Sequence, residues 1–183
     1  PVDLGALLKE SLEENKMFAA EQKIDLVLPK GDQTATITGD AFALRQIIDN
    51  LVSNAIKFSE QGSTVEGSLS IRNGHVRLSI KDSGRGIPDG MEGQVFGRFE
   101  QVKNGGQYAT QGSGLGLHIS QQLAQQMSGK LFYDSVVGEG TTFHMEFTTV
   151  AAQQPAVILS AADNTDDTPT PASTGDTPEA VQA

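Results

Sequence analysis

Four short segments hold the residue types that could carry out chemistry: residues 50–58, 82–88, 96–99 and 112–117. In that order they supply two asparagines with a lysine, a carboxylate beside paired glycines, an arginine between two phenylalanines, and a glycine-rich run. A carboxylate can recognise a base, backbone amides can bind phosphates, and an asparagine oxygen can bind a metal. The combination predicts a nucleotide site, and ATP is the nucleotide we expect.

The first segment is expected to lie on a long helix with one polar side. Asn50, Asn54, Lys57 and Phe58 stand at i, i+4, i+7 and i+8, so they share that side, and the apolar residues face a sheet. Mg²⁺ prefers oxygen ligands and needs few from the protein, so we predict Asn54 as its ligand. Lys57 is predicted to meet a phosphate as a point charge. Taken alone, the asparagines would fit an ordinary solvent-facing helix side.

Asp82 is expected at the end of a strand, just before Gly84 and Gly86. A carboxylate there can accept from the exocyclic amino group of adenine, a donor that guanine lacks at the equivalent position. The two glycines can adopt positive φ and let the backbone approach a flat base. Alone, the segment would fit an ordinary β-turn. The adenine interpretation therefore depends on the other segments.

The fourth segment, Gly112-Ser-Gly114-Leu-Gly116-Leu, directly precedes a predicted helix. Unpaired backbone N–H groups at such a helix start, with the helix dipole, favour an anion. The segment is not a P-loop, because no Gly-Lys-Ser/Thr follows it. It does not fit a dinucleotide fold either, since no parallel βαβ unit surrounds it. We therefore predict a phosphate-binding loop of another kind.

These segments need a scaffold of helices alternating with antiparallel hairpins. The apolar spacing predicts helices at about 3–23, capped by Asp3, and at 40–58 and 115–127. Strands are expected at 24–28 and 34–38 around a turn, at 64–72 and 75–81 around Asn73-Gly74, and at 130–136 and 141–150. Residues 89–111 are expected to be irregular. We predict a two-layer α/β sandwich in which a mixed β-sheet carries its helices on one face.

Composition divides the chain into a folded part and a tail. Five of the 23 acidic residues and none of the 13 basic residues follow residue 150, in a stretch rich in Ala, Thr, Pro and Gln. Such a stretch has too little apolar surface to offset its ordering entropy. We predict one domain at residues 1–150 and a disordered, acidic Pro/Thr-rich tail or linker at 151–183.

Charge and residue usage exclude several classes of function. The formal net charge is -10 and no basic stripe is present, which argues against nucleic-acid binding. The chain has no cysteine, its three histidines lack metal-ligand spacing, and no apolar run approaches the roughly 20 residues of a membrane span. It starts with Pro-Val-Asp-Leu, without an initiator Met or a signal-peptide pattern. We therefore expect a piece of a longer protein that makes no membrane contact itself.

The four segments resemble the N, G1, F and G2 boxes of sensor histidine kinases, in matching order and spacing. Gly138-Glu-Gly140-Thr141-Thr-Phe143 resembles the last box of the same domain. The resemblance covers about residues 1–150. It implies the catalytic and ATP-binding domain with the Bergerat fold, shared with gyrase, mismatch-repair and chaperone ATPases. Residues 101–111 would then form a mobile ATP lid.

The resemblance also implies roles for individual residues. Asp82 would read the adenine, Asn54 would hold Mg²⁺, and Asn50, Lys57 and Arg98 would act in catalysis. The nucleotide-binding residues it implies are Asn54, Lys57, Phe58, Asp82, Gly84, Gly86, Ile87, Gly112, Ser113, Gly114, Leu115, Gly116, Leu117 and Thr142.

Asn50 separates the branches of this superfamily. Hydrolytic members and similar serine kinases carry at this position a glutamate that acts as general base. An amide cannot accept a proton, so water is not activated and the γ-phosphoryl can be kept for a protein acceptor. We therefore expect a protein-histidine kinase. The alternatives are a hydrolytic ATPase or serine kinase of the same fold, or a degenerate module that only binds a partner.

The phosphoacceptor histidine of the family is not in this chain. None of His75, His118 and His144 stands in the family's acceptor pattern, a His followed by an acidic residue and then Arg-Thr/Asn-Pro. We expect the acceptor on a dimerisation domain of the full protein, with a response regulator receiver domain as the next partner. The fragment alone should bind ATP without autophosphorylation. The tail either tethers a receiver domain or is a frayed terminus, and the expected location is cytoplasmic, in a parent that can be membrane-anchored.

Overall fold

A computed structural model describes residues 1–28, 34–97 and 114–150 of the chain. The elements are β1 (Val2–Asp3), α1 (Leu4–Glu14), α2 (Lys16–Glu21), β2 (Asp25–Val27), β3 (Thr36–Ile37), α3 (Ala41–Phe58), β4 (Thr64–Arg72), β5 (His75–Lys81), α4 (Glu92–Val95), α5 (Gly116–Gln126), β6 (Lys130–Val136) and β7 (Gly140–Thr148).

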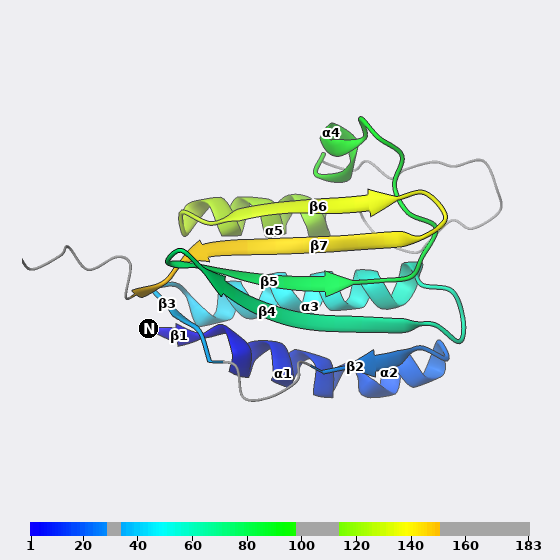
Figure 1. Cartoon of the computed structure of the whole chain (residues 1–183), viewed down its shortest axis with the longest axis horizontal. Helices are drawn as coiled ribbons and strands as arrows, with labels where there is room; N and C mark the ends of the chain where they lie inside the picture. The colour runs from blue at the N-terminus through cyan, green and yellow to red at the C-terminus, as the bar shows by residue number, and fades with distance from the viewer. Residues whose placement is uncertain (29–33, 98–113, 151–183) are drawn as a thin grey trace, which may run out of the picture.

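A five-stranded sheet in the order β2-β4-β5-β7-β6 forms one layer of the fold. β2 pairs with β4 in parallel and the other pairs are antiparallel, so the sheet is mixed. β1 and β3 form a separate two-stranded antiparallel sheet. Figure 1 shows α3 and α5 side by side behind the main sheet, whose other face is turned toward the viewer. This architecture confirms the predicted sandwich.

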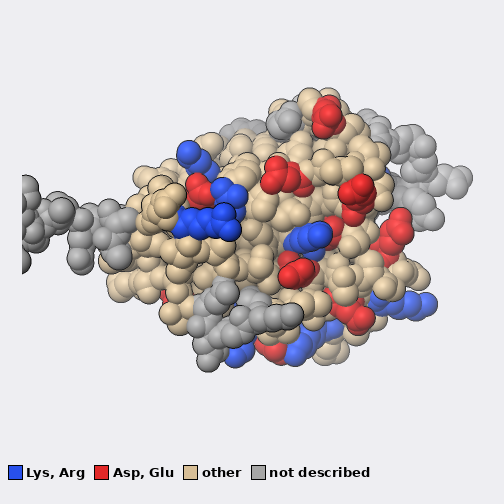
Figure 2. All heavy atoms as spheres, viewed as in Figure 1, with Lys and Arg blue, Asp and Glu red and all other residues tan. Residues whose placement is uncertain are grey.

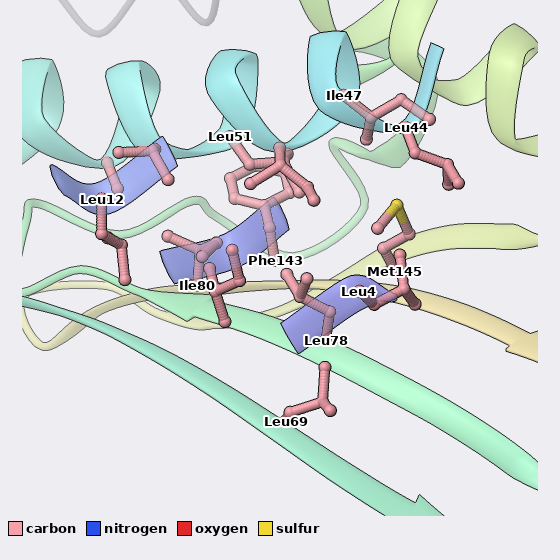
Figure 3. Close-up of a cluster of buried hydrophobic side chains, with 14 of the residues drawn as sticks. Leu4, Leu12, Leu44, Ile47, Leu51, Leu69, Leu78, Ile80, Phe143 and Met145 are labelled. Atoms are coloured by element: carbon pink, nitrogen blue, oxygen red, sulfur yellow. The ribbon is translucent and has the colours of Figure 1, made fainter. Parts of the chain in front are cut away.

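The hydrophobic core fills the space between the helices and the sheet, as Figure 3 shows. Leu44, Ile47 and Leu51 of α3 are fully buried, and so are Leu78 and Ile80 of β5 beneath them. α1 adds a second row of fully buried leucines: Leu4, Leu8 and Leu12. Burial on this scale is the main force that fixes α3 against the sheet.

α3 begins and runs as its sequence predicts. The Asp40 side chain caps it by accepting from the backbone N–H groups of Phe42 and Ala43, at 2.8 and 3.2 Å. Its apolar side is buried, whereas Asn50 and Asn54 on the other side are only half-buried. α3 therefore presents its asparagines away from the core.

Polar contacts join α1 to the side of α3. The Arg45 guanidinium forms ion pairs with Glu10, Glu14 and Asp49. Ser11, which is fully buried, donates from Oγ to Asp49 Oδ1 at 2.5 Å. These contacts hold α3 from the side opposite to α5.

Both predicted long hairpins are present. Asn73 and Gly74 have φ values of 52° and 75°, the positive values that a two-residue type I′ turn requires. Alternation along β5 buries Val76, Leu78 and Ile80 on the helix side and turns Arg77, Ser79 and Lys81 to the open face. Figure 2 shows acidic and basic side chains interspersed on that open face, where Arg77 pairs with Glu146 at 2.7 Å.

Three expectations for the scaffold are wrong. The strands at 24–28 and 34–38 do not pair with each other, because β2 pairs with β4 and β3 pairs with β1. The first helix breaks at Asn15, whose side-chain amide and backbone N–H both donate to the carbonyl of Ser11. The irregular stretch after residue 89 contains the one-turn helix α4.

Several predicted features lie outside the described residues: the turn at 29–32, the lid at 101–111 and the tail at 151–183. They stay predictions, as does the domain boundary at residue 150. Within the described ranges, no helix combines the length and the apolar character needed to cross a membrane.

Candidate active site at the ends of α3 and β5

Asp82 stands immediately after β5 and is 4% exposed. Its Oδ1 accepts from the backbone N–H of Gly84 at 2.9 Å and from that of Thr141 at 3.1 Å. Burial raises the pKa of this carboxyl above its ordinary value, and the two backbone hydrogen bonds partly oppose that rise. Oδ2 has no hydrogen-bond partner in the described part of the chain. A fixed carboxylate thus keeps one oxygen for a ligand.

Gly84 lets two segments approach closely beside Asp82. A Cβ at this position would lie 2.3 Å from the carbonyl oxygen of Phe58, and Ser59 and Gly84 form an isolated β-bridge. The sequence allows positive φ at both glycines of this turn. Gly86 has it, at 72°, but Gly84 does not, so Gly84 is needed for space. The bridge places the last turn of α3 against the Asp82 turn.

The turn after Asp82 is also tied to the β6–β7 hairpin. The Ile87 N–H donates to Ser135 Oγ at 2.8 Å, and Ser135 donates in turn to the carbonyl of Gly140 at 2.9 Å. The Thr141 hydroxyl lies 2.9 Å from Ser135 Oγ. Asp82 is therefore held from two sides, by α3 and by this hairpin.

The asparagines of α3 face α5. Asn50 donates from Nδ2 to Ser120 Oγ at 3.0 Å, and Asn54 donates from Nδ2 to Asn50 Oδ1 at 3.4 Å. Gly116, the first residue of α5, lies so close that a Cβ there would come within 2.4 Å of Asn50 Oδ1. The N-terminal part of α5 therefore packs directly on Asn50, a predicted catalytic residue, and Asn54, the predicted metal ligand, bonds to the same amide.

The last turn of α3 carries the other two polar-side residues of the first segment. Lys57 is exposed, and Phe58 is 38% exposed. The guanidinium of Arg85 lies over the Phe58 ring at 5.7 Å, within cation–π range. Arg85 is in the turn that follows Asp82, so this contact again joins the first two segments.

The structure describes only part of the predicted anion site at the start of α5, from Gly114 onward. Leu115 is its N-cap residue and offers no side-chain hydrogen bond to the first turn, while Gly114 before it has a φ of 66°. Leu117 is partly buried against the core. Gly112, Ser113 and Arg98 lie outside the described residues, so their roles stay predictions.

Thr142 does not face this site. It is paired with Lys81 and Asp134 in the sheet and shares the open face with Arg77. Thr141, one residue earlier, is 5% exposed, lies on the helix side and contacts Asp82. Because side chains alternate along a strand, a one-residue error moves the side chain to the other face. We therefore replace Thr142 by Thr141 in the candidate site.

The structure brings the N-box and G1-box residues together and adds three that the sequence reasoning missed: Thr141, Ser135 and Ser120. Thr141 could have been found from its place in the β5–β7 pairing, two residues before buried Phe143. Ser120 stands one helical turn after Gly116 and so shares its side of α5. Ser135 carries no comparable signal in the sequence.

Three comparisons relate the chain to known proteins. The profile of the family described as histidine kinase-, DNA gyrase B-, and HSP90-like ATPase matches residues 39–151. The aerobic respiration control sensor protein ArcB of Escherichia coli K12 is 36% identical over 179 residues, which cover 94% of this chain and 22% of ArcB. The chain thus spans about a fifth of that relative's length.

Solved structures agree with this. The mycobacterial sensor histidine kinase MprB is 29% identical with a TM-score of 0.68, over 81% of this chain and 96% of that one. Full-length ShkA, solved in complex with AMPPNP, is 34% identical with a TM-score of 0.69, over 84% of this chain and 32% of that one. The chain belongs to the histidine kinase-, DNA gyrase B-, and HSP90-like ATPase family, as the catalytic and ATP-binding domain of a sensor histidine kinase.

Proposed function

We propose that the chain binds Mg²⁺–ATP and donates the γ-phosphoryl group to a histidine on a separate dimerisation and phosphoacceptor domain. The observation that carries the proposal is the hydrogen bonding of the Asp82 carboxylate. Two backbone amides hold its Oδ1, and its Oδ2 is left as an acceptor beside the last turn of α3. An acceptor of this kind suits the amino group of adenine. The similar protein ShkA was solved with AMPPNP, a nonhydrolysable ATP analogue, and this supports nucleotide binding as the role of the site.

The described residues fit both the nucleotide and the metal. Asn54 Oδ1 is a neutral oxygen that takes part in no hydrogen bond within the described ranges, and such an oxygen suits Mg²⁺. The exposed ammonium of Lys57 stands one turn further along the same side of α3, where it can contact a phosphate. When bound, Mg²⁺ would neutralise charge on the phosphate oxygens.

The chain's own contribution would be positioning. Asp82 would orient the base, Lys57 and the backbone at Gly114 to Leu117 would hold phosphates, and Arg98 would add a cation near the γ-phosphate. Asn50 gives its amide hydrogen to Ser120 and offers no basic group to water. Phosphoryl transfer needs little covalent assistance, so such positioning accounts for most of the catalysis we expect.

The partners follow from the proposal. The acceptor nitrogen would come from the histidine domain of the full protein, and the phosphohistidine would pass its phosphoryl group to a response regulator receiver domain. The relatives are named sensor proteins much longer than this chain, which supports partner domains in the parent.

The test has two stages. Mg²⁺–ATP is first titrated into the 183-residue chain by calorimetry, and a separate cognate phosphoacceptor domain is then added with γ-labelled ATP. We expect binding, no labelling of the chain alone, and labelling of the acceptor domain. Absence of binding would refute the proposal. Release of phosphate without a labelled protein would indicate a hydrolase of the same fold, and binding with neither reaction would indicate a partner-binding module.

The metal assignment has its own test. Asn54→Ala removes the only proposed metal ligand on α3, so the tighter binding that Mg²⁺ gives over EDTA should disappear in the variant. Metal-free affinity should stay unchanged, because Asp82 is untouched. Asn15→Ala, at the junction of α1 and α2, serves as the control asparagine variant. If Asn54→Ala binds Mg²⁺–ATP as the unaltered chain does, the assignment is wrong.

A further inference from the structure

Three side chains from two helices form a hydrogen-bonded row beside the proposed metal ligand. Ser120 of α5 accepts from Asn50 Nδ2 at 3.0 Å, and Asn50 Oδ1 accepts from Asn54 Nδ2 at 3.4 Å. Ser120 is 2% exposed, so water does not compete freely for its hydroxyl. The row starts in the packed interface between α5 and α3 and ends at Asn54.

The direction of this row determines which end of each amide faces outward. A side-chain amide has a donating NH₂ end and an accepting oxygen end. Because Asn50 gives its Nδ2 to Ser120, its Oδ1 is the end that meets Asn54. Asn54 must then donate to it from Nδ2, which leaves the Oδ1 of Asn54 pointing away from Asn50. If Asn50 turned over, two donors would face each other and Asn54 would turn as well.

Gly116 supplies the room for this arrangement. A Cβ at Gly116 would lie 2.4 Å from Asn50 Oδ1 and 3.2 Å from Asn50 Nδ2, so any larger residue would displace the amide. Gly116 and Ser120 are one helical turn apart on the same side of α5. One makes space for the Asn50 amide and the other holds it by a hydrogen bond.

We propose that Ser120 is a positioning residue: its hydroxyl bond holds the Asn50 amide in place beside Asn54, in the arrangement where Asn54 presents its oxygen, and not its NH₂ group, to the cation. The inference rests on the proposed function, because it needs Asn54 as the metal ligand. It assigns α5 a second role besides phosphate binding, since the helix also orients the metal ligand on its neighbour.

The chain offers a closely matched control for testing Ser120. Ser11 is also buried, also belongs to a helix beside α3, and also bonds a polar side chain of α3, at Asp49 instead of Asn50. Ser120→Ala and Ser11→Ala therefore each remove one buried hydroxyl and one contact to α3. Only the first change reaches the proposed metal ligand.

The measured quantity is the ratio of the dissociation constants for AMPPNP in EDTA and in Mg²⁺. Loss of one buried hydrogen bond predicts a ratio about three- to tenfold smaller in Ser120→Ala, through weaker binding in Mg²⁺ alone. Ser11→Ala should keep the ratio of the unaltered chain, whatever its thermal midpoint. In an Asn50→Ala background, Ser120→Ala should have no further effect, because Ser120 acts through Asn50.

A second readout needs neither metal nor nucleotide. In ¹H–¹⁵N spectra of the free chain, the side-chain amide signals of both Asn50 and Asn54 should shift in Ser120→Ala and stay in place in Ser11→Ala. Unmoved signals would overturn the inference, as would an unchanged ratio or an equal loss of affinity in EDTA and in Mg²⁺. If AMPPNP binding to the unaltered chain does not depend on Mg²⁺, the metal part of the proposed function fails. The amide signals still test whether Ser120, Asn50 and Asn54 form the hydrogen-bonded row.

Discussion

Replacing Asp82 by Asn should change which base the domain prefers while leaving the fold intact. The Asp and Asn side chains have the same shape, and an amide oxygen can keep both hydrogen bonds that Oδ1 accepts from the N–H groups of Gly84 and Thr141. The other end of the side chain then becomes an NH₂ donor. Facing the amino group of adenine, it would set a donor against a donor where the carboxylate had accepted.

The expected magnitude follows from the bond that is lost. A hydrogen bond to a charged group contributes about 1.5–3 kcal/mol. Its loss should weaken ATP binding by about 10- to 150-fold, since about 1.4 kcal/mol corresponds to a factor of ten. Stability should not fall, because burial of the charged carboxyl is unfavourable, as the raised pKa of Asp82 indicates.

Calorimetry with ATP and with inosine triphosphate measures the effect. The inosine base carries a carbonyl oxygen where adenine carries its amino group, so the new NH₂ of Asn can donate to it. We expect the variant to lose affinity for ATP and to gain affinity for inosine triphosphate, with a thermal midpoint at or above that of the unaltered chain. Asp134→Asn, an exposed change on the open face of the sheet, should alter neither affinity.

Two results would refute this reasoning. One is unchanged preference between the two nucleotides in Asp82→Asn. The other is an equal loss of affinity for both, which would mean that Asp82 supports the shape of the site and does not read the base.

Two further predictions concern stability. Gly84→Ala places a Cβ about 2.3 Å from the backbone oxygen of Phe58, so the turn must shift, and the free energy of unfolding in urea should fall by about 1–3 kcal/mol; an unchanged value would show that the contact yields easily. Burial lowers the pKa of His144 below its ordinary value, with Asp134 partly opposing the change. The unfolded chain therefore binds the proton more readily, so the stability from neutral His144 should be complete above about pH 6.5 and decline as the pH falls toward the lower folded pKa. The free energy of unfolding in urea is measured from pH 8 to 5.5 for the unaltered chain and for His144→Gln. Parallel dependence on pH in the two proteins would contradict the prediction.

Local sequence signals were sufficient to predict the elements whose ends and faces depend on neighbouring residues alone. The Asp40 cap and apolar periodicity define α3, and Asn73-Gly74 defines the turn between β4 and β5. The pairing of β2 could not be read in the same way, because its partner β4 begins 37 residues after β2 ends, and the sheet decides that pairing. The break at Asn15 coincides with a side-chain hydrogen bond to the Ser11 carbonyl, a local contact that the apolar pattern does not reveal.

The candidate site was predictable to a similar extent. Asn50, Asn54 and Asp82 could be chosen because each stands at a recognisable place on its own element. Thr141 and Thr142 are both threonines, and only the register of β7 decides which one faces Asp82. Ser120 depends on how close α5 approaches α3, which follows from the missing side chain at Gly116 and not from any feature of the serine itself.

The close contact between Gly84 and Phe58 has a consequence for selection among nucleotides. It joins the turn that carries Asp82 to the last turn of α3 backbone to backbone, so the separation between the two turns is set by the backbone. In the proposed complex, one turn holds the base and the other holds the phosphates. A ligand that satisfies both must span that fixed separation, so the domain would select a nucleotide by its length as well as by its base.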